Sequence, residues 1–220
     1  MAPHLDAEKF RESLLNWWKE NGRSFPWRDT RNPYHILISE ILLHRTRADQ
    51  VVPVYKEFIR AFPTVRDLAS ARSEDVMRIL RPLGLFWRSK LIVRMANIIV
   101  TKFHGEIPYT KEDLESLPGV NHYIASAVRC FAWGEAEPLL DTNTVRILGR
   151  IFGLKVTDSS RRSKRFRQLY QDLIDTKHPR EFNYAMIDLG ALICTPKNPR
   201  CAACPVNQQC SHGRGLGVEG

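Results

Sequence analysis

The sequence predicts an all-α protein. Apolar residues recur at helical spacing along most of the 220-residue chain, as in residues 6–20, where Phe10, Leu14, Trp17 and Trp18 share one face. Residues that start or stop helices (Asn, Ser, Thr, Gly and Pro) separate these periodic segments. No alternating strand pattern of useful length and no internal repeat interrupts them. We therefore expect about ten helices.

An apolar helix over residues 34–45 is expected to form a core, because it is apolar almost all round. Glu40 shares one side of this helix with three apolar residues, Ile36, Leu37 and Leu43. A carboxylate without a partner in such surroundings would be costly to bury, and desolvation would raise its pKa. Glu40 is therefore a candidate functional residue.

The other expected helices are placed by their capping and breaking residues. In the first half of the chain they cover residues 6–20 before Asn21-Gly22, residues 46–62, a short segment from Pro63-Thr64, a segment capped by Ser73, and a long segment from Ile92 to Phe103 before Gly105. In the second half they are a segment from Thr110, a segment from about His122, a segment capped by Asp141, residues 161–167 and residues 182–193. The segment over residues 161–167 is strongly basic.

The chain as a whole carries a basic excess. It has 33 basic and 24 acidic side chains, a formal net charge of +9, and 43% hydrophobic residues, enough for one large domain or two lobes. A charge of this size favours a polyanionic partner, since attraction to phosphates is long-ranged and independent of sequence. The first residues lack an apolar signal segment and no run of about 18 apolar residues occurs. We expect a soluble cytoplasmic protein without membrane association.

Four of the five cysteines form one motif near the C-terminal end: Cys194-x6-Cys201-x2-Cys204-x5-Cys210. A cytoplasmic chain does not normally keep disulfides, so this cluster predicts a metal site. Four thiolates in a short loop suit either tetrahedral zinc or a [4Fe–4S] cluster. Cys130 lies inside an apolar helical segment and is expected to be a small core residue.

A tight turn is predicted at Leu117-Pro118-Gly119-Val120-Asn121, between two helices. Pro118 fixes φ, Gly119 permits a positive φ, and Asn is one of the few other residues that adopts the left-handed region cheaply. Such a hairpin leaves backbone N–H groups at the start of the second helix, near His122, which suit a phosphate. About twenty residues later Asp141 stands at an expected helix N-cap, with Asn143 beside it.

These residues resemble the helix-hairpin-helix DNA glycosylase superfamily, whose pattern is Leu-Pro-Gly-Val-Gly, one helix, then Val-Asp-x-Asn/His-x-x-Arg-Val. This chain departs from that pattern at Asn121, where the family usually has glycine. The resemblance extends from Phe25-Pro26-Trp27-Arg28 through Cys210. The cysteine spacing is similar to the cluster loop of the endonuclease III branch, which implies a [4Fe–4S] cluster rather than zinc on Cys194, Cys201, Cys204 and Cys210.

The resemblance also implies two helical lobes with a cleft between them. One lobe would comprise residues 1–28 and 134–220, with the cluster loop at 194–210, and the other residues 29–133, ending in the hairpin motif at about 111–133. Glu40 and Asp141 would meet at the cleft as the catalytic pair.

The chemistry of N-glycosidic bond cleavage explains why the family needs these side chains. Asp141 would stabilise positive charge on the sugar or orient water, Glu40 would assist the departing base, and Asn143 would hold Asp141 or a phosphate. Tyr123 occupies the position of the lysine that forms a Schiff base in glycosylases with lyase activity. Since tyrosine cannot form one, the resemblance implies a monofunctional enzyme.

Further residues are expected to contact DNA once the target base leaves the stack. Leu85 matches the position of the residue that fills the gap, and His44-Arg45 stands where the MutY adenine glycosylases have Gln-Gln and the MIG thymine mismatch glycosylases have Arg-Arg. Both positions, and the short chain after the cysteines, favour MIG. The complete set of expected DNA-binding residues is Leu85, His44, Arg45, Gly119, Asn121, His122 and Arg88.

The sequence therefore predicts a monofunctional, monomeric glycosylase that removes thymine or uracil opposite guanine from double-stranded DNA, associates with the nucleoid, and leaves an abasic site. The first alternative is an adenine glycosylase acting on A opposite G or 8-oxoguanine. A second alternative, from a different class, is a non-catalytic DNA-binding module that uses the hairpin and the cluster as a scaffold.

Overall fold

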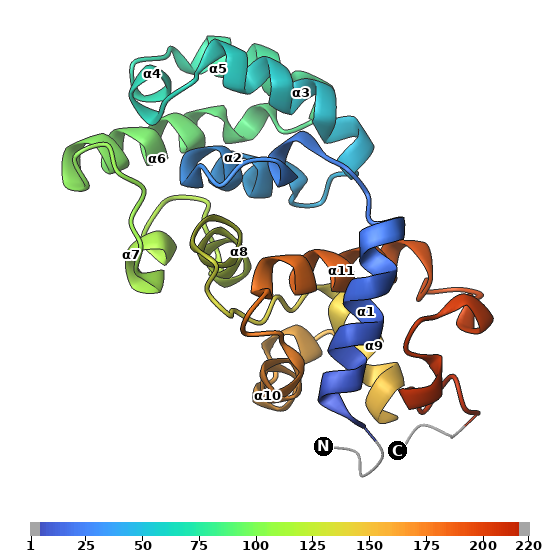
Figure 1. Ribbon diagram of the computed structural model, residues 1–220. Coiled ribbons are helices and arrows are strands. Elements are labelled where there is room, and N and C mark those ends of the chain that lie inside the picture. The colour runs from blue at the N-terminus through green and yellow to red at the C-terminus, as the bar shows by residue number, and fades with distance from the viewer. Residues whose placement is uncertain (1–4, 216–220) are drawn as a thin grey trace. The chain divides into compact units, whose positions relative to one another are not determined.

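The computed structural model describes residues 5–215, and the prediction of an all-α fold is confirmed (Figure 1). Within that range the chain forms eleven α-helices and six short 3-10 helices, and no strand. No helix of this part of the chain is long and apolar enough to cross a membrane.

The chain divides into two compact units. The first comprises Met1–Arg23 and Gly134–Gly220, and the second Ser24–Trp133. The expected range 1–28 therefore runs five residues too far, because residues 24–28 belong to the second unit. Trp27 explains this difference: it is buried, stacks on Phe25 at 4.9 Å between ring centroids, and meets Tyr55 edge-on at 5.5 Å.

The second unit is built around its most buried helix. The helices of this unit are η1 Pro26–Arg28, α2 Pro33–Leu43, α3 Ala48–Ala61, α4 Val65–Ala69, α5 Ser73–Leu80, η2 Arg81–Leu83, η3 Phe86–Arg88, α6 Ser89–Lys102, α7 Lys111–Glu115 and α8 His122–Trp133. Eight of the eleven residues of α2 are buried, and α2 packs against α3 and α8. A helix that is apolar all round must be covered on every side, as the sequence predicted.

Local capping explains where several of these helices begin. The Asn32 side chain accepts hydrogen bonds from the N–H groups of Tyr34 and His35, with Pro33 as the first helical residue.

Two of the helix starts expected from the sequence were wrong. Ser73 is the first residue of α5 and not its cap, and α3 begins at Ala48 rather than Thr46.

The late start of α3 follows from the backbone between α2 and α3. Arg45 adopts a positive φ of 67°, which a right-handed helix does not permit. The chain therefore breaks after α2 and resumes as a helix two residues beyond Thr46.

The first unit joins the start of the chain to its C-terminal half. Its helices are α1 Ala7–Asn21, α9 Thr142–Phe152, η4 Ser160–Arg162, α10 Lys164–Leu173, α11 Pro179–Leu192, η5 Cys201–Ala203 and η6 Asn207–Gln209. Helix α1 packs on α10 and α11 through a core that includes Phe10, Leu14 and Phe182. The basic stretch expected as one helix is divided, because Ser163 separates η4 from α10.

A buried carboxylate ties α1 to α11. Asp188 is fully buried and accepts hydrogen bonds from Trp18 Nε1 at 3.0 Å, Arg23 N–H at 3.0 Å and Arg23 Nε at 2.7 Å. Several donors compensate the cost of burying one charge. The last turn of α1 and the residue that ends the first segment of this unit are thereby fixed to its C-terminal half.

Candidate active site and iron–sulfur loop

The hairpin between α7 and α8 forms as the sequence predicts. Gly119 has a φ of 85°, and the Val120 N–H bonds to Leu117 O at 3.1 Å to close the turn. A Cβ atom on Gly119 would lie 2.9 Å from the Leu91 side chain on α6. The positive φ favours glycine at this position, and a Cβ there would also have to displace the end of the Leu91 side chain.

Asn121 plays a different role from the one expected. Among the described residues, the non-glycine residues with positive φ are Arg45, His104 and Asn198, so Asn121 does not adopt the left-handed conformation. Its side chain instead accepts a hydrogen bond from Ile124 N–H at 3.0 Å. This contact occupies one of the N-terminal N–H groups of α8, so less of the helix start remains for a phosphate than an uncapped helix would offer.

His122, the first residue of α8, pairs with an acidic side chain of α7. Its Nδ1 lies 2.7 Å from Glu115 Oε1, and both side chains are largely exposed. The histidine that begins α8 is therefore held by a carboxylate across the turn.

Asp141 is the N-cap of α9, which confirms its expected structural place. Its carboxylate accepts hydrogen bonds from Asn143 N–H at 2.8 Å, Thr144 N–H at 2.7 Å and Asn143 Nδ2 at 3.1 Å. The Thr144 hydroxyl in turn accepts a bond from Asp141 N–H at 2.8 Å, which completes a capping box. Asp141 is half-buried, so the carboxylate is fixed in direction and still reaches solvent.

Behind Asp141, hydrogen bonds continue to the cysteine loop. Arg146 Nη2 donates to Asn143 Oδ1 at 2.9 Å and to Gly190 O at 2.9 Å, while its Nε donates to Cys194 O at 2.8 Å. Burial is the main cause that lowers the pKa of the Arg146 guanidinium. The family pattern has an arginine at the position of Arg146, but no role was predicted for this side chain, although its position three residues after Asn143 places both on one helix face.

A second arginine of α9 binds the cysteine loop one turn later. Arg150 donates to Thr195 O at 2.8 Å, Pro196 O at 3.1 Å and the sulfur of Cys194 at 3.2 Å. Arg150 has no contact to Asn143 among the hydrogen bonds of the described residues. Arg150 thus binds the cysteine loop alone, whereas Arg146 links the loop to Asn143, which hydrogen-bonds Asp141.

The four clustered cysteines lie close enough to influence one another. Burial is the main cause that raises the pKa of the Cys204 thiol to about 12, and the thiols of Cys194, Cys210 and Cys201 raise it further. Burial is also the main cause that raises the pKa of the Cys210 thiol, while the backbone of Gly213 and His212 acts in the opposite direction. None of the five cysteines, all within the described residues, forms a disulfide.

This donor set fits an iron–sulfur cluster. A [4Fe–4S] cluster binds one thiolate on each iron, and Cys194, Cys201, Cys204 and Cys210 can supply four. Arg150 donates a hydrogen bond to the sulfur of Cys194, and donors of this kind stabilise a cluster. Cys130 is fully buried in α8, away from this loop in sequence and in the other unit.

Glu40 and Tyr123 both belong to the second unit. Glu40 is 7% exposed on α2, and Tyr123 is half-buried in the first turn of α8, the helix that packs against α2. Asp141 and Asn143 belong to the first unit. The candidate catalytic residues thus divide between the two units, two in each.

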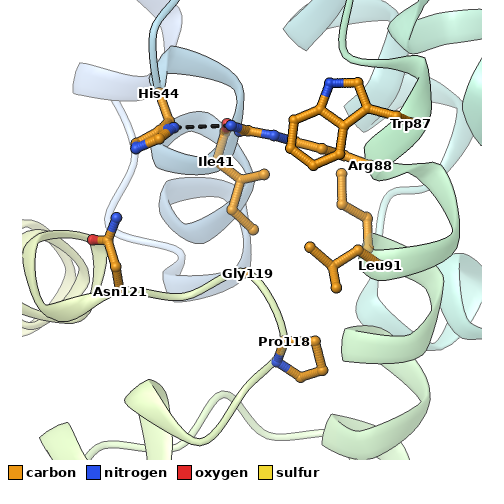
Figure 2. Close-up of a pocket in the computed structure, with 9 residues that line it drawn as sticks. Ile41, His44, Trp87, Arg88, Leu91, Pro118, Gly119 and Asn121 are labelled. Atoms are coloured by element: carbon orange, nitrogen blue, oxygen red, sulfur yellow. Dashed lines mark hydrogen bonds between the residues drawn. The ribbon is translucent and has the colours of Figure 1, made fainter.

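A cavity of about 190 Å³ in the second unit gathers several of the expected DNA-binding residues (Figure 2). It is lined by Ile41, His44, Trp87, Arg88, Leu91, Ile92, Pro118, Gly119 and Asn121. Arg45 is exposed beside His44. Leu85, expected to insert into DNA, is only 7% exposed, whereas the two aromatic residues that follow it in η3 are exposed.

The chain is similar to known proteins of one family. Residues 38–172 match the model of the HhH-GPD superfamily of base excision DNA repair proteins, and residues 194–210 match the iron–sulfur binding domain of endonuclease III. The chain belongs to the HhH-GPD superfamily. It is a DNA glycosylase of that family with an endonuclease III-type iron–sulfur domain, so the predicted enzyme class and the [4Fe–4S] cofactor are confirmed.

Three curated relatives and one solved structure show its place in the family. The thymine-DNA glycosylase of Aeropyrum pernix is 43% identical over 92% of this chain and 93% of its own length, and the thymine/uracil-DNA glycosylase of Pyrobaculum aerophilum 37% identical over 92% and 90%. The human adenine DNA glycosylase is 36% identical over 93% of this chain but 39% of its own length. The structure of a thermostable thymine-DNA glycosylase matches with a TM-score of 0.87 and 31% identity, over 95% of this chain and 97% of that one.

Proposed function

We propose that this glycosylase removes thymine or uracil mispaired with guanine in double-stranded DNA, acts as a monomer, and leaves an abasic site. The observation that carries the proposal is the similarity to thymine and thymine/uracil glycosylases over nearly the full length of both chains. Adenine glycosylase activity is the second candidate, favoured by the 36% identity to the human adenine enzyme, of which this chain spans 39%.

Asp141 is proposed to be the central catalytic residue. Cleavage of the N-glycosidic bond builds positive charge on the sugar, and a fixed carboxylate stabilises that charge without having to reorient. Three N–H donors hold the Asp141 carboxylate, and two of them come from Asn143. Asn143 is thus proposed to aim Asp141 at the sugar.

Glu40 is proposed to assist the departing base. It is the buried acidic residue of an otherwise apolar helix, and a carboxyl group in such a place can deliver a proton or a hydrogen bond to the leaving base. Tyr123 offers no amine for a Schiff base, so the proposed reaction stops at hydrolysis and does not cut the DNA strand.

The DNA-binding role is assigned to residues of the second unit. Gly119, Asn121 and His122 shape the hairpin that would meet a phosphate. His44 and Arg88 line the cavity, and Arg45 is exposed next to His44 in the chain. Leu85 stays a candidate for DNA insertion only if its side chain leaves the buried position it has in this structure.

The cluster would be held by Cys194, Cys201, Cys204 and Cys210, and when bound it supplies a structural brace for the loop they belong to. Through Arg146 and Arg150 this loop is joined to α9, the helix that Asp141 caps. The cluster is thus proposed to stabilise the helix that presents the catalytic carboxylate.

The test is an excision assay on end-labelled duplexes that carry one G:T, G:U, G:A or 8-oxoguanine:A pair. We expect strand breaks at G:T and G:U only, and only after hot alkali, since an abasic site breaks under alkali. Breaks confined to the adenine pairs would support the second candidate, and breaks without alkali would contradict the role given to Tyr123.

The matched variant is Asp141→Asn. Asparagine keeps an oxygen that can cap α9, so the fold and duplex binding should persist while the excision rate falls about 10²–10³-fold or more. Circular dichroism and a gel-shift titration provide the controls. An unchanged excision rate in this variant would contradict the role given to the charge on Asp141, and duplex binding without excision by the wild type would favour the non-catalytic DNA-binding module.

A further inference from the structure

Two large aromatic side chains are exposed side by side in the chain on the short turn η3. Phe86 is 51% exposed and Trp87 60%, whereas Leu85 before them is 7% exposed. A tryptophan is usually buried to a large degree, because its indole carries a large apolar surface. An exposed one beside a cavity therefore indicates a surface that contacts another molecule.

The Trp87 indole is held by a guanidinium that is itself fixed. Arg88 Cζ lies 4.8 Å from the centroid of the Trp87 ring, and Arg88 is only 9% exposed. Arg88 donates to Ile41 O at 2.8 Å, and its Nη2 lies 2.8 Å from His44 Nδ1 (Figure 2). Both partners lie at the C-terminal end of α2, the core helix of this unit. The indole is thus presented in a defined orientation by a chain of contacts that ends in the core.

The cavity that Trp87 lines has the size and the walls suited to one planar ring system. Its volume of about 190 Å³ is below the range typical of sites for larger ligands. Ile41, Leu91 and Pro118 supply apolar walls, and His44 and Asn121 supply polar groups. A ring that enters beside the indole would thus find apolar contact on its faces and hydrogen-bonding groups at its edge.

The charge around the cavity favours a ligand rich in acceptor atoms. None of the nine lining residues is acidic, and Arg88 forms no ion pair among the described residues. Arg88 donates to His44 Nδ1, so a neutral His44 carries its proton on Nε2 and can donate from there. Guanine presents two acceptors, O6 and N7, on one edge. The hairpin residues Pro118 and Gly119 form part of the same cavity.

We propose that Trp87, rather than Leu85, is the side chain that stacks on the unpaired guanine left opposite the excised base, with Arg88 as the residue that positions the indole. The proposal rests on the proposed function in that the ligand is a DNA duplex with an unpaired base. Stacking on an aromatic side chain is worth about 1–3 kcal/mol per base, which corresponds to roughly a 5- to 150-fold change in affinity.

The test uses a duplex in which an abasic analogue, tetrahydrofuran, stands opposite 2-aminopurine, a fluorescent purine whose emission falls when it stacks. This duplex needs no excision, so its result is independent of which base the enzyme removes. The 220-residue protein with its cluster loaded is titrated as wild type, Trp87→Ala, Trp87→Phe, Leu85→Ala and Phe86→Ala. Circular dichroism verifies that each variant is folded.

We expect Trp87→Ala to bind about 5- to 150-fold more weakly than wild type and to leave the 2-aminopurine emission higher in the saturated complex. Trp87→Phe should restore most of the affinity and of the quenching, since phenylalanine retains an aromatic face. Phe86→Ala is the matched control, because Phe86 is also exposed on the same turn but does not line the cavity. It should bind within about twofold of wild type.

Wild-type affinity and quenching in Trp87→Ala would overturn the proposal, and so would an equal loss in Phe86→Ala, which would point to a general apolar contact. A loss of quenching confined to Leu85→Ala would return the stacking role to Leu85. Failure of the proposed function has a separate signature, since it would appear as absent excision at G:T and G:U while this binding experiment still reports on Trp87.

Discussion

The substitution Arg146→Met tests whether hydrogen bonds from the cysteine loop help to orient Asp141. Methionine retains much of the aliphatic length of arginine but removes the three strong hydrogen bonds to Asn143 Oδ1, Gly190 O and Cys194 O, at 2.8 to 2.9 Å. We expect two effects: a loss of stability in the first unit, and a slower excision rate because Asn143 loses the group that orients its amide.

The magnitude follows from the environment of these bonds. A hydrogen bond to a charged group contributes about 1.5–3 kcal/mol, but water can replace the guanidinium at acceptors that are only part-buried. The expected loss in the free energy of unfolding is therefore about 2–4 kcal/mol, or roughly 4–16 °C in the melting temperature. Loss of a residue that orients an active group typically lowers activity about 10- to 100-fold.

The assay combines thermal unfolding, the visible absorbance of the cluster, and single-turnover excision at saturating enzyme. Arg150→Met is the matched control: it loses contacts to Cys194, Thr195 and Pro196 but none to Asn143. It should disturb the cluster absorbance at least as much as Arg146→Met while slowing excision less. Equal excision by wild type and Arg146→Met, or a larger defect in Arg150→Met, would refute the reasoning.

Two other expectations follow from the second unit. Gly119→Ala should lower the free energy of unfolding by about 1–3 kcal/mol and weaken duplex binding, because φ is 85° and the new Cβ would stand 2.9 Å from the Leu91 side chain. Urea denaturation measures the stability and gel-shift titration measures the binding. A variant as stable as wild type would contradict this reasoning. Burial, followed by the charges of Arg88 and Arg45, lowers the pKa of His44 below 6.5, so the folded state favours neutral histidine and its stability should fall as the pH drops below about 6.5. His44→Gln, which keeps an acceptor for Arg88, should lose less stability than wild type between about pH 7.5 and pH 5.5, and equal losses would contradict the assignment.

Much of the site could be predicted from sequence because its elements are local. A glycine in the hairpin, an aspartate that caps the following helix and four cysteines within seventeen residues each depend on neighbours a few positions away. The helix over Pro33–Leu43 was likewise predictable, since a segment that is apolar on all sides has to be buried. These features, together with the family resemblance that they carry, predicted the fold class and the cofactor.

Features that depend on contacts between residues far apart in the chain could not be predicted from the sequence in this way. Asn121 was expected in the left-handed conformation, but it caps α8 instead. Leu85 was expected to fill the gap left in the DNA, yet its side chain is only 7% exposed, whereas Trp87 two residues later is 60% exposed. The expected boundary at residue 28 shifted because Trp27 packs on Tyr55, a contact across 28 positions that no local pattern encodes.

The sequence by itself determined which helices form, where the hairpin and the Asp141 cap lie, and that four thiolates are available to a cluster, because these follow from short-range propensities and spacing. Only the tertiary structure decided how these parts are connected. Arg146 reaches from Asn143 to Cys194, and Arg88 reaches from Trp87 to the end of α2. Side chains that bridge segments 44 to 48 positions apart gain their partners only when the core has packed.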